Sequence, residues 1–505
     1  MYDILIKNAI VYDGLGGEPF LSDIAVTDGK IARVAPAIAE SAERVVDATG
    51  LSLTPGFIDS HSHSDNMQDE YPLMKEKLEQ GITLDVTGQC GFSEAPRTLK
   101  DGTVLSGVAH YAMQGDGAKH GAYSLPLVGF NTLRTIVMGR ENRAATKEEI
   151  ASMQALLRTE MQNGAAGLSL GLIYVPGCYA STEEVIAVAS VVKEFDGIIA
   201  SHIRDEGDEL IAAVEEFLTV IRETGCRAVF SHHKACGGKR NWGKVKTSLA
   251  MIDAANAQGC DIYLDVYPYV ASHTTMQSTF VPPHLHPAGC KDVRDLLSDP
   301  EILAKAEAFF DERYEKDYTW IVVGKCPARP EYQGERIVDL ARARGLSPMA
   351  FLYELMKECR GVTGCFFTMC EEDVETVLRH PRAMIGTDSS LGGDFVYYHP
   401  RVRGTFVRAI ARYVRERKIV SLPEMIRKMT SLPAKVYRLP TKGVIREGMD
   451  ADICIFDYER LTDRADFKAP TQNNIGLSYV LVNGEIVVED GVANGTRPAG
   501  VILKT

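Results

Sequence analysis

Short apolar runs alternate with amphipathic, helix-like stretches through the middle of this 505-residue chain, and this alternation constrains the fold most strongly. The run AAGLSLGLIY precedes STEEVIAVASVVKEF, and the run GIIASHIRDE precedes DELIAAVEEFLTVIRETG. RAVFSHHK and DIYLDVYPY continue the series, so that a run recurs about every 30 residues, the size of a βαβ unit. The sequence therefore predicts an α/β fold, with a parallel sheet or a TIM-like (β/α)8 barrel.

The two ends of the chain are β-rich and differ from the middle. DILIKNAIVYDG and DIAVTDGKIARVAP lie near the start, and SYVLVNGEIVVEDGVA lies near the end. Asp-Gly and Asn-Gly between apolar runs are typical of tight hairpins. Because chain termini often lie close together, we expect residues 1–55 and 440–505 to form one small β-sandwich domain. The barrel is then expected at residues 56–439.

The stretch from about Val281 to Gly361 interrupts the rhythm of the barrel. It contains VPPHLHPAG, an acidic helix-like segment and the strand-like YTWIVVG. Insertions into barrels enlarge the loops that carry the active site. We therefore expect an α/β insertion at about 281–361 beside the functional face.

Charge and apolar patterning argue against several kinds of partner. The formal net charge is −13, which disfavours nucleic acid. No apolar run approaches the ~18 residues of a membrane-spanning helix, so no membrane partner is expected. The opening residues MYDILIKNAI lack the features of an export signal, which predicts a cytoplasmic protein. The eleven cysteines form no CxxC pair, and most are expected to be reduced and buried.

Potential metal ligands follow the apolar runs. In GFIDSHSHSD (56–65), His61 and His63 are two residues apart, so on extended backbone they point to the same side. Further candidates stand just past other runs: Cys90, His202, His232, His233 and Asp388. Each alone is ordinarily a core or surface histidine, a buried thiol or a turn aspartate. The C-terminal ends of barrel strands meet at one face, however, so together these side chains predict a metal site.

Several motifs of this chain resemble the D-aminoacylase (N-acyl-D-amino-acid deacylase) family of the metal-dependent amidohydrolase superfamily. They follow the family's order from about residue 56 to 457: GFIDSHSHSD, GQCGFS, SLGLIYVPG, HIRDEGD, FSHHK, DVYPY, HPRVRGTF and KMTSLPAKVYRLPTKGVIREGMDADICIFD. The paired histidines identify only the superfamily. The cysteine, FSHHK and DVYPY elements are typical of the narrower family.

The resemblance implies a tightly bound zinc ion held by Cys90, His202 and His232. It also implies a second, weaker metal position, lined by His61, His63 and Asp388. A thiolate with two imidazoles suits zinc, and zinc binding keeps the thiol deprotonated.

The reaction that the resemblance implies is hydrolysis of the amide bond of N-acyl-D-amino acids, small molecules that yield a carboxylic acid and a D-amino acid. Amides are poor electrophiles, and zinc can polarise the carbonyl and lower the pKa of bound water toward ~7. By resemblance, Asp388 is the general base and then acid, Tyr174 stabilises the oxyanion, and His233 assists. The D configuration follows from the resemblance alone.

The substrate's α-carboxylate is expected to bind Lys234, Tyr267 and Arg401, which match the family's carboxylate-binding positions. The chain departs from the family pattern in two places near the expected pocket. His273 stands where the family usually has serine, and the loop SSLGGDFVYY after Asp388 is about two residues longer. His273 is therefore a further candidate for substrate contact, and both departures bear on specificity.

Two alternatives remain at this stage. The first is another amidohydrolase activity, on cyclic amides such as hydantoins and dihydropyrimidines or on dipeptides. Those relatives commonly bridge two metals with a carboxylated lysine, whereas residues 82–90 offer Cys90 and no lysine. The second is a non-catalytic assembly protein, which would be expected to have gaps in the ligand set. No such gap is found, and the sequence does not indicate an oligomeric state.

Overall fold

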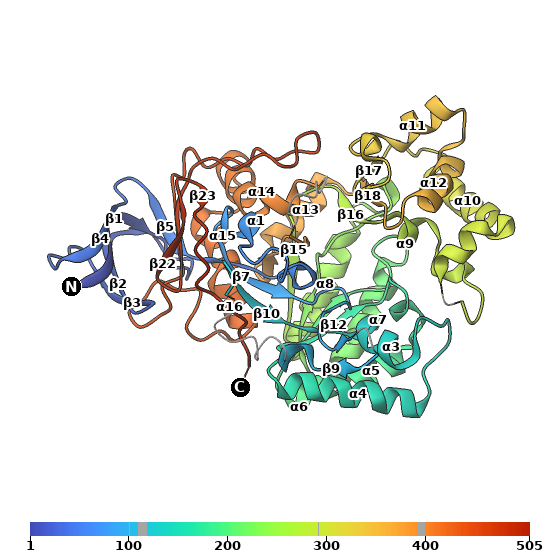
Figure 1. Ribbon diagram of the computed structural model, residues 1–505, viewed down its shortest axis with the longest axis horizontal. Coiled ribbons are helices and arrows are strands. Elements are labelled where there is room, and N and C mark those ends of the chain that lie inside the picture. Colours follow the sequence, from blue (N-terminus) through green and yellow to red (C-terminus); the bar gives the residue numbers. More distant parts are fainter. Residues whose placement is uncertain (100–101, 110–118, 291, 392–398, 505) are drawn as a thin grey trace.

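The computed structural model describes residues 1–99, 102–109, 119–290, 292–391 and 399–504. Three regions follow one another along its longest axis: a β-rich end, a central body of strands and helices, and a mainly helical end (Figure 1). The predicted mixed α/β class is therefore confirmed. No helix in these described ranges is both long and apolar enough to cross a membrane.

Strands from both ends of the chain pair into one nine-stranded sheet. Its N-terminal members are β1 (Tyr2–Val11), β2 (Phe20–Thr27), β3 (Lys30–Ala35), β4 (Ala42–Asp47) and β5 (Ser52–Pro55). Its C-terminal members are β20 (Ile453–Phe456), β21 (Leu477–Val482), β22 (Glu485–Glu489) and β23 (Val492–Ala493). The two groups meet where β5 runs antiparallel to β20. Pairing is thus continuous across the described strands, whereas a sandwich of two sheets was expected.

The predicted hairpins of this sheet form at Asp28-Gly29 and Asn483-Gly484. All four residues have positive φ, between 50° and 78°, as a two-residue turn of the hairpin-matching type requires. Alternate residues of β1, including Ile4 and Ile6, point into a small apolar core that the sheet shares with the segment around Met449.

The central body contains two parallel sheets. The first has the order β10 (Tyr123–Pro126), β7 (Ile82–Thr87), β6 (Phe57–Asp59). The second has the order β11 (Val128–Gly129), β12 (Gly167–Gly171), β13 (Ile198–His202), β14 (Arg227–Phe230), β15 (Ile262–Val266), β19 (Ala383–Ile385). These strands are almost wholly buried, as expected of parallel strands covered by helices.

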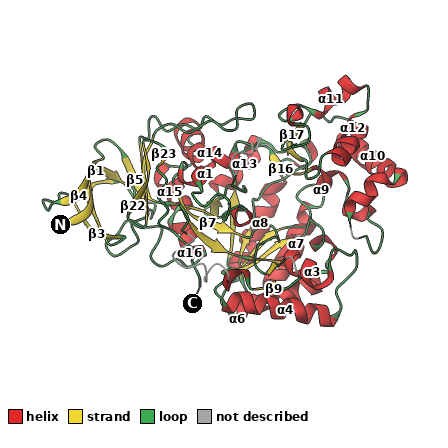
Figure 2. Ribbon diagram, viewed as in Figure 1, coloured by secondary structure: helices red, strands yellow, loops and turns green. Residues whose placement is uncertain are grey.

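Helices connect these strands and pack around them (Figure 2). The main ones are α3 (Phe130–Met138), α4 (Lys147–Gln162), α5 (Thr182–Ala189), α7 (Leu210–Thr224), α8 (Lys244–Ala257) and α13 (Glu371–Arg379). The helix expected at STEE begins at Thr182, where the Ser181 hydroxyl accepts the Glu184 backbone N–H. Each crossover returns the chain to the same end of the sheet, so the loops after the strands gather at one face.

The interruption of the rhythm is a separate small subdomain, residues 272–366, called here the inserted subdomain. It comprises β16 (Ser272–Thr275), α9 (Met276–Phe280), α10 (Pro300–Tyr314), β17 (Ile321–Val323), α11 (Ile337–Arg344), α12 (Pro348–Glu358) and β18 (Thr363–Phe366). Its antiparallel sheet, ordered β16-β18-β17, packs on an apolar core of its own. The subdomain starts at β16, before the expected residue 281. The sequence does not predict this strand, because Ser-His-Thr-Thr has no apolar pattern.

Candidate metal centre

Three side chains of the predicted site come from left-handed backbone just past the ends of parallel strands. Cys90, His232 and Asp388 have φ of 53°, 34° and 49° and follow β7, β14 and β19. This region costs a non-glycine residue roughly 1–2 kcal/mol, and such strain gathers at functional sites. Gly88 and Gly91, with φ of 72° and 81°, supply the rest of the tight turn at Cys90. These turns direct the thiol, the imidazole and the carboxylate toward one point.

Cys90, His202 and His232 form one compact group of potential ligands. Their ligand atoms all lie within 4.8 Å of one another, and Cys90 Sγ is 3.3 Å from His232 Nε2. His202 is buried, and neither of its ring nitrogens makes a hydrogen bond to a described residue, although Nε2 lies 3.6 Å from Glu206 Oε2. A buried imidazole without partners is unfavourable unless a group such as a metal ion completes it. The donor set of one sulfur and two nitrogens fits zinc.

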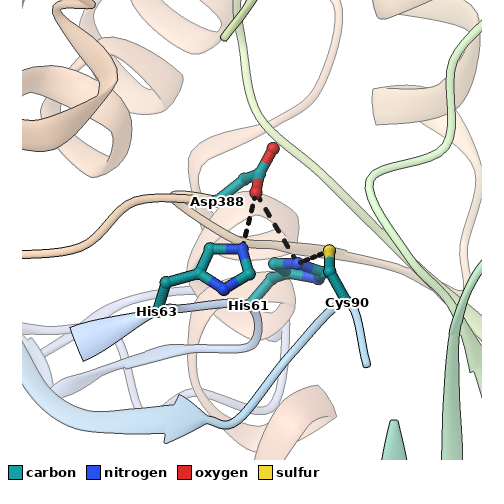
Figure 3. Close-up of side chains that lie close together, drawn as sticks. All are labelled: His61, His63, Cys90 and Asp388. Atoms are coloured by element: carbon teal, nitrogen blue, oxygen red, sulfur yellow. Dashed lines mark hydrogen bonds and ion pairs between the residues drawn. The ribbon is translucent and has the colours of Figure 1, made fainter. Parts of the chain in front are cut away.

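His61, His63, Cys90 and Asp388 form a second group, also with ligand atoms within 4.8 Å (Figure 3). His63 Nε2 lies 3.1 Å from Asp388 Oδ1, and His61 Nε2 lies 3.3 Å from Cys90 Sγ. Cys90 belongs to both groups. A single thiolate therefore stands between two neighbouring potential metal positions.

The electrostatics of the pocket favour a thiolate at Cys90. Burial alone would raise the pKa of this thiol, but the neighbouring imidazoles of His61, His232 and His202 hold it well below its usual value. A thiolate is the form that binds a metal ion.

Two buried carboxylates orient the imidazoles from behind. Asp265, at the end of β15, lies 3.3 Å from His61 Nδ1 and accepts the backbone N–H of His232 at 2.6 Å. Glu206 lies 3.0 Å from His232 Nδ1. Contacts at Nδ1 leave Nε2 for the metal, a common arrangement for histidine ligands. Asp265 belongs to the DVYPY motif and Glu206 to the HIRDEGD motif, and the sequence alone indicates no role for either acid.

A buried lysine lies beneath the paired histidines. Lys77 Nζ donates to Asp59 Oδ2 at 2.7 Å, to Ser62 Oγ at 2.9 Å and to Thr387 Oγ1 at 3.0 Å. It also pairs with Asp85 at 3.3 Å, and all five side chains are about 1% exposed or less. This group was not anticipated from the sequence.

The lysine network joins the two loops that carry His61, His63 and Asp388. Ser62 stands between the two histidines, and Thr387 directly precedes Asp388. Backbone bonds add to the connection: the Asp388 N–H donates to the His61 carbonyl at 2.8 Å, and the His63 N–H donates to the Ser389 carbonyl at 2.9 Å. The relative positions of these ligands are therefore set by contacts between residues far apart in the chain.

The predicted carboxylate-binding residues surround Asp388. Arg401 Nη1 donates to Asp388 Oδ2 at 2.7 Å. The Tyr267 ring lies between two cations, 5.6 Å from Lys234 Nζ and 5.0 Å from Arg401 Cζ. His273 accepts from Arg401 Nη2 through its backbone carbonyl, while its Nε2 contacts Thr363 Oγ1 at 2.8 Å. Of the SSLGGDFVYY loop, residues 392–398 lie outside the described residues.

Tyr174 lies beside the ligand group and lines the same two cavities as Asp388. Its ring centroid is 4.9 Å from that of His202, and its hydroxyl is 3.3 Å from Thr274 Oγ1. Burial and the nearby Cys90 charge raise the pKa of this phenol well above its usual value. Tyr174 therefore keeps its proton and can donate a hydrogen bond.

The structure does not bring His233 into the site. Its Nε2 is 2.9 Å from Ser248 Oγ on α8, and its ring packs on Phe230 with centroids 4.6 Å apart. The chain turns at His232, whose φ is 34°, and past this turn His232 faces the ligands while His233 faces the helix layer. The expected assisting role of His233 therefore lacks the geometry it needs.

Two cavities open onto the ligand group. Cavity A, about 490 Å³, is lined by residues that include Cys90, Phe92, Tyr174, Asp388 and Arg401. Cavity B, about 540 Å³, is lined by residues that include Tyr174, His202, Lys234, Tyr267 and Asp388. Both cavities also contact the inserted subdomain, so this subdomain forms part of the wall around the site.

Known proteins resemble this chain over its whole length. The amidohydrolase family profile matches residues 44–488. N-acyl-D-glutamate deacylase of Alcaligenes xylosoxydans xylosoxydans is 34% identical, over 95% of this chain and 93% of its own. D-aminoacylase of the same organism is 33% identical, over 100% and 98%. The crystal structure of N-acyl-D-glutamate deacylase from Bordetella bronchiseptica, complexed with zinc and a phosphonate mimic of the tetrahedral intermediate, superposes with a TM-score of 0.86. It is 33% identical and covers 100% of both chains.

Proposed function

Because this chain belongs to the amidohydrolase family, and within it to the D-aminoacylases, we propose that it is a zinc-dependent hydrolase of N-acyl-D-amino acids. The products are a carboxylic acid and a free D-amino acid. The observation that carries this proposal is the Cys90–His202–His232 group beside Asp388, in which neither His202 nitrogen makes a hydrogen bond to a described residue.

Cys90, His202 and His232 would hold the tightly bound zinc, and His61, His63 and Asp388 would line a weaker second position. When bound, zinc polarises the amide carbonyl and lowers the pKa of a water molecule. The neutral hydroxyl of Tyr174 is the donor for the oxyanion that forms on the carbonyl.

Asp388 would take the proton of the attacking water and deliver it to the leaving nitrogen. Burial opposes ionisation of this carboxyl, but Arg401 and the neighbouring imidazoles hold its pKa well below the usual value. Asp388 is therefore ionised and able to accept a proton.

Lys234 and Arg401, with Tyr267 between them, would bind the α-carboxylate. If His232 directs Nε2 to the metal, its Nδ1 carries a proton and donates a hydrogen bond to Glu206. Lys234 Nζ lies 2.6 Å from Glu206, 3.0 Å from the His232 carbonyl and 2.7 Å from His232 Nδ1. A protonated Nδ1 cannot accept from the ammonium, so the third Lys234 donor would turn to the substrate.

The two parallel sheets are proposed to be parts of one eight-membered barrel. Strand β10 continues through Leu127 into β11, so both sheets share one strand position. On the other side, the Ser60 N–H donates to the Ile385 carbonyl, and Ser62 bridges Ser389 in parallel. The terminal sheet, residues 1–55 and 440–505, and the inserted subdomain would then be additions to a barrel at 56–439. This arrangement places every proposed ligand at one barrel face.

The proposal is tested by incubating the zinc-loaded protein with N-acetyl-D- and N-acetyl-L-forms of the same amino acids and measuring the free amine. Release from D-forms, with a bound zinc ion per chain, is expected. Hydantoin and dihydrouracil serve as controls for a cyclic-amide activity. Cleavage of L-forms alone, or of cyclic amides alone, would refute the proposal.

A further inference from the structure

Aromatic side chains of the inserted subdomain line cavity B on the side away from the ligand group. Phe309, Phe310 and Tyr314 come from α10, and Trp320 and Phe366 come from the segment that includes β17 and β18. The Tyr314 and Trp320 rings have centroids 4.3 Å apart, and Trp320 and Phe366 are 6.0 Å apart. Five aromatic residues thus form one continuous wall, called here the aromatic wall.

The amino-acid end of a substrate would face this wall. Of the proposed carboxylate-binding residues, Lys234 and Tyr267 line cavity B and Arg401 lines cavity A, while Asp388 lines both cavities. The α-carboxylate and the side chain are attached to the same carbon atom, so a carboxylate at Lys234 keeps the side chain within reach of cavity B. The acyl group, on the other side of the amide, is then left with cavity A.

Each cation that lines cavity B already pairs with an acid. Lys234 pairs with Glu206 at 2.6 Å, Arg204 with Glu216 at 2.8 Å, and Arg313 with Asp208 at 3.3 Å, an acid that it shares with Arg240. An acidic substrate side chain would add a negative charge where each of these cations already has an acidic partner. Moving a charge from water into such a place is unfavourable.

Arg313 is also held in place by close packing. Its guanidinium lies between two loops of the central body at Gly207 and Gly237, where an added Cβ would approach Nη2 to 2.4 and 3.0 Å. The same guanidinium lies 5.8 Å from the ring centroids of Phe309 and Tyr314. Arg313 thus anchors the aromatic wall to the barrel side of the cavity.

We propose that cavity B is the subsite for the substrate's side chain and that it selects large apolar side chains, aromatic ones above all, over acidic ones. This inference rests on the proposed function and narrows it. A flat ring can stack on Trp320 and Tyr314, whereas a carboxylate of similar length would meet only cations that already pair with acids.

The direct test compares kcat/KM of the zinc-loaded full chain for N-acetyl-D-phenylalanine, N-acetyl-D-alanine and N-acetyl-D-glutamate. The expected order is phenylalanine above alanine above glutamate, with about 100-fold or more between the first and last. A preference for glutamate, or equal rates for glutamate and phenylalanine, overturns the inference and leaves the proposed deacylase function intact.

Variants of the wall sharpen the test. Trp320→Leu should lower kcat/KM for the phenylalanine substrate by about 10-fold or more and change the alanine substrate less than about 3-fold. Tyr332→Leu is the matched control, because Tyr332 is an aromatic residue of the same subdomain that packs on Phe351 and does not line cavity B. An equal loss on both substrates in the Trp320 variant would contradict side-chain recognition.

A binding measurement is independent of turnover. The chain has two tryptophans, so Trp242→Phe leaves Trp320 as the only indole, and Asp388→Asn suppresses cleavage. In this double variant, N-acetyl-D-phenylalanine should change the Trp320 emission saturably and bind at least about 10-fold more tightly than N-acetyl-D-glutamate. If the double variant binds in this way but the unmodified chain cleaves neither substrate, only the proposed function is refuted. An unchanged Trp320 emission would refute the subsite.

Discussion

Arg401 and Asp388 form a buried ion pair in which Nη1 and Oδ2 are 2.7 Å apart, with side chains only 5% and 12% exposed. The carboxylate that is proposed to move protons thus already contacts the cation that is proposed to bind the substrate. Arg401, proposed to bind the substrate, and Asp388, proposed to transfer protons, are therefore in direct contact. Each role can be tested by a substitution.

Asp388→Asn should retain the tightly bound zinc and lose turnover. An amide keeps the size of the side chain but cannot accept the proton of water, so kcat should fall by about 10²–10⁴-fold. Zinc stoichiometry and kcat for N-acetyl-D-alanine are measured on the same preparation. Near-normal turnover would exclude an acid–base role for Asp388.

Arg401→Met should remove recognition of the α-carboxylate. The unmodified protein is expected to prefer N-acetyl-D-alanine to N-acetyl-D-alaninamide, because only the first carries the anion that Arg401 and Lys234 bind. In the variant this ratio of kcat/KM should fall by about 10-fold or more, with zinc content unchanged. An unchanged ratio would show that the carboxylate binds elsewhere.

Lys77→Met should destabilise the protein strongly, because it leaves the Asp59 and Asp85 carboxylates buried without their cation. Breaking a buried pair in this way typically costs about 3–5 kcal/mol of unfolding free energy. Lys75→Met is the matched control on the same helix, since the Lys75 side chain is 46% exposed and pairs only loosely with Glu79. Equal unfolding free energies for the two variants in denaturant would contradict a bracing role for Lys77.

Asp85 should make the stability depend on pH. Burial raises its pKa from 3.8 to about 7, against the opposing effect of Lys77. Between these values the folded state binds more protons than the unfolded state, so the free energy of unfolding falls as pH rises, by up to about 1.4 kcal/mol per pH unit. The stabilising contribution is fully present below the unfolded pKa and is lost as pH rises through about 7.

Asp85→Asn removes this titration. The stability of the variant relative to the unmodified protein should therefore increase from pH 5 to pH 8, as measured by denaturant unfolding at each pH. A difference that stays constant over this range would place the pKa of Asp85 outside it.

The side chains that the sequence places just past apolar runs lie close together in the structure. His61, Cys90, His202, His232 and Asp388 each follow an apolar run, and parallel topology brings such positions together without any knowledge of side-chain packing. His233 differs because the chain turns at His232, and the sequence alone does not say which of two adjacent histidines faces inward.

The supporting residues could not be predicted in the same way. Lys77 contacts Thr387, which is 310 positions away in the sequence. Glu206 can orient His232 and pair with Lys234 only because the fold places all three side chains together. Their signal is a buried charge, which a sequence without a structure does not reveal. The aromatic wall is similar: the sequence indicates only a helix-like and a strand-like segment at Phe309 and Trp320, and packing shows that both residues line a cavity.

The proposed metal centre requires Cys90 to be a zinc ligand. Zinc K-edge X-ray absorption of the zinc-loaded protein tests this ligation directly. It should show one sulfur scatterer at about 2.3 Å together with nitrogen scatterers at about 2.0–2.1 Å. In Cys90→Ser the sulfur shell should disappear and the zinc content should fall. A zinc shell without sulfur in the unmodified protein, or full zinc binding in a Cys90→Ala variant, would contradict the proposed centre.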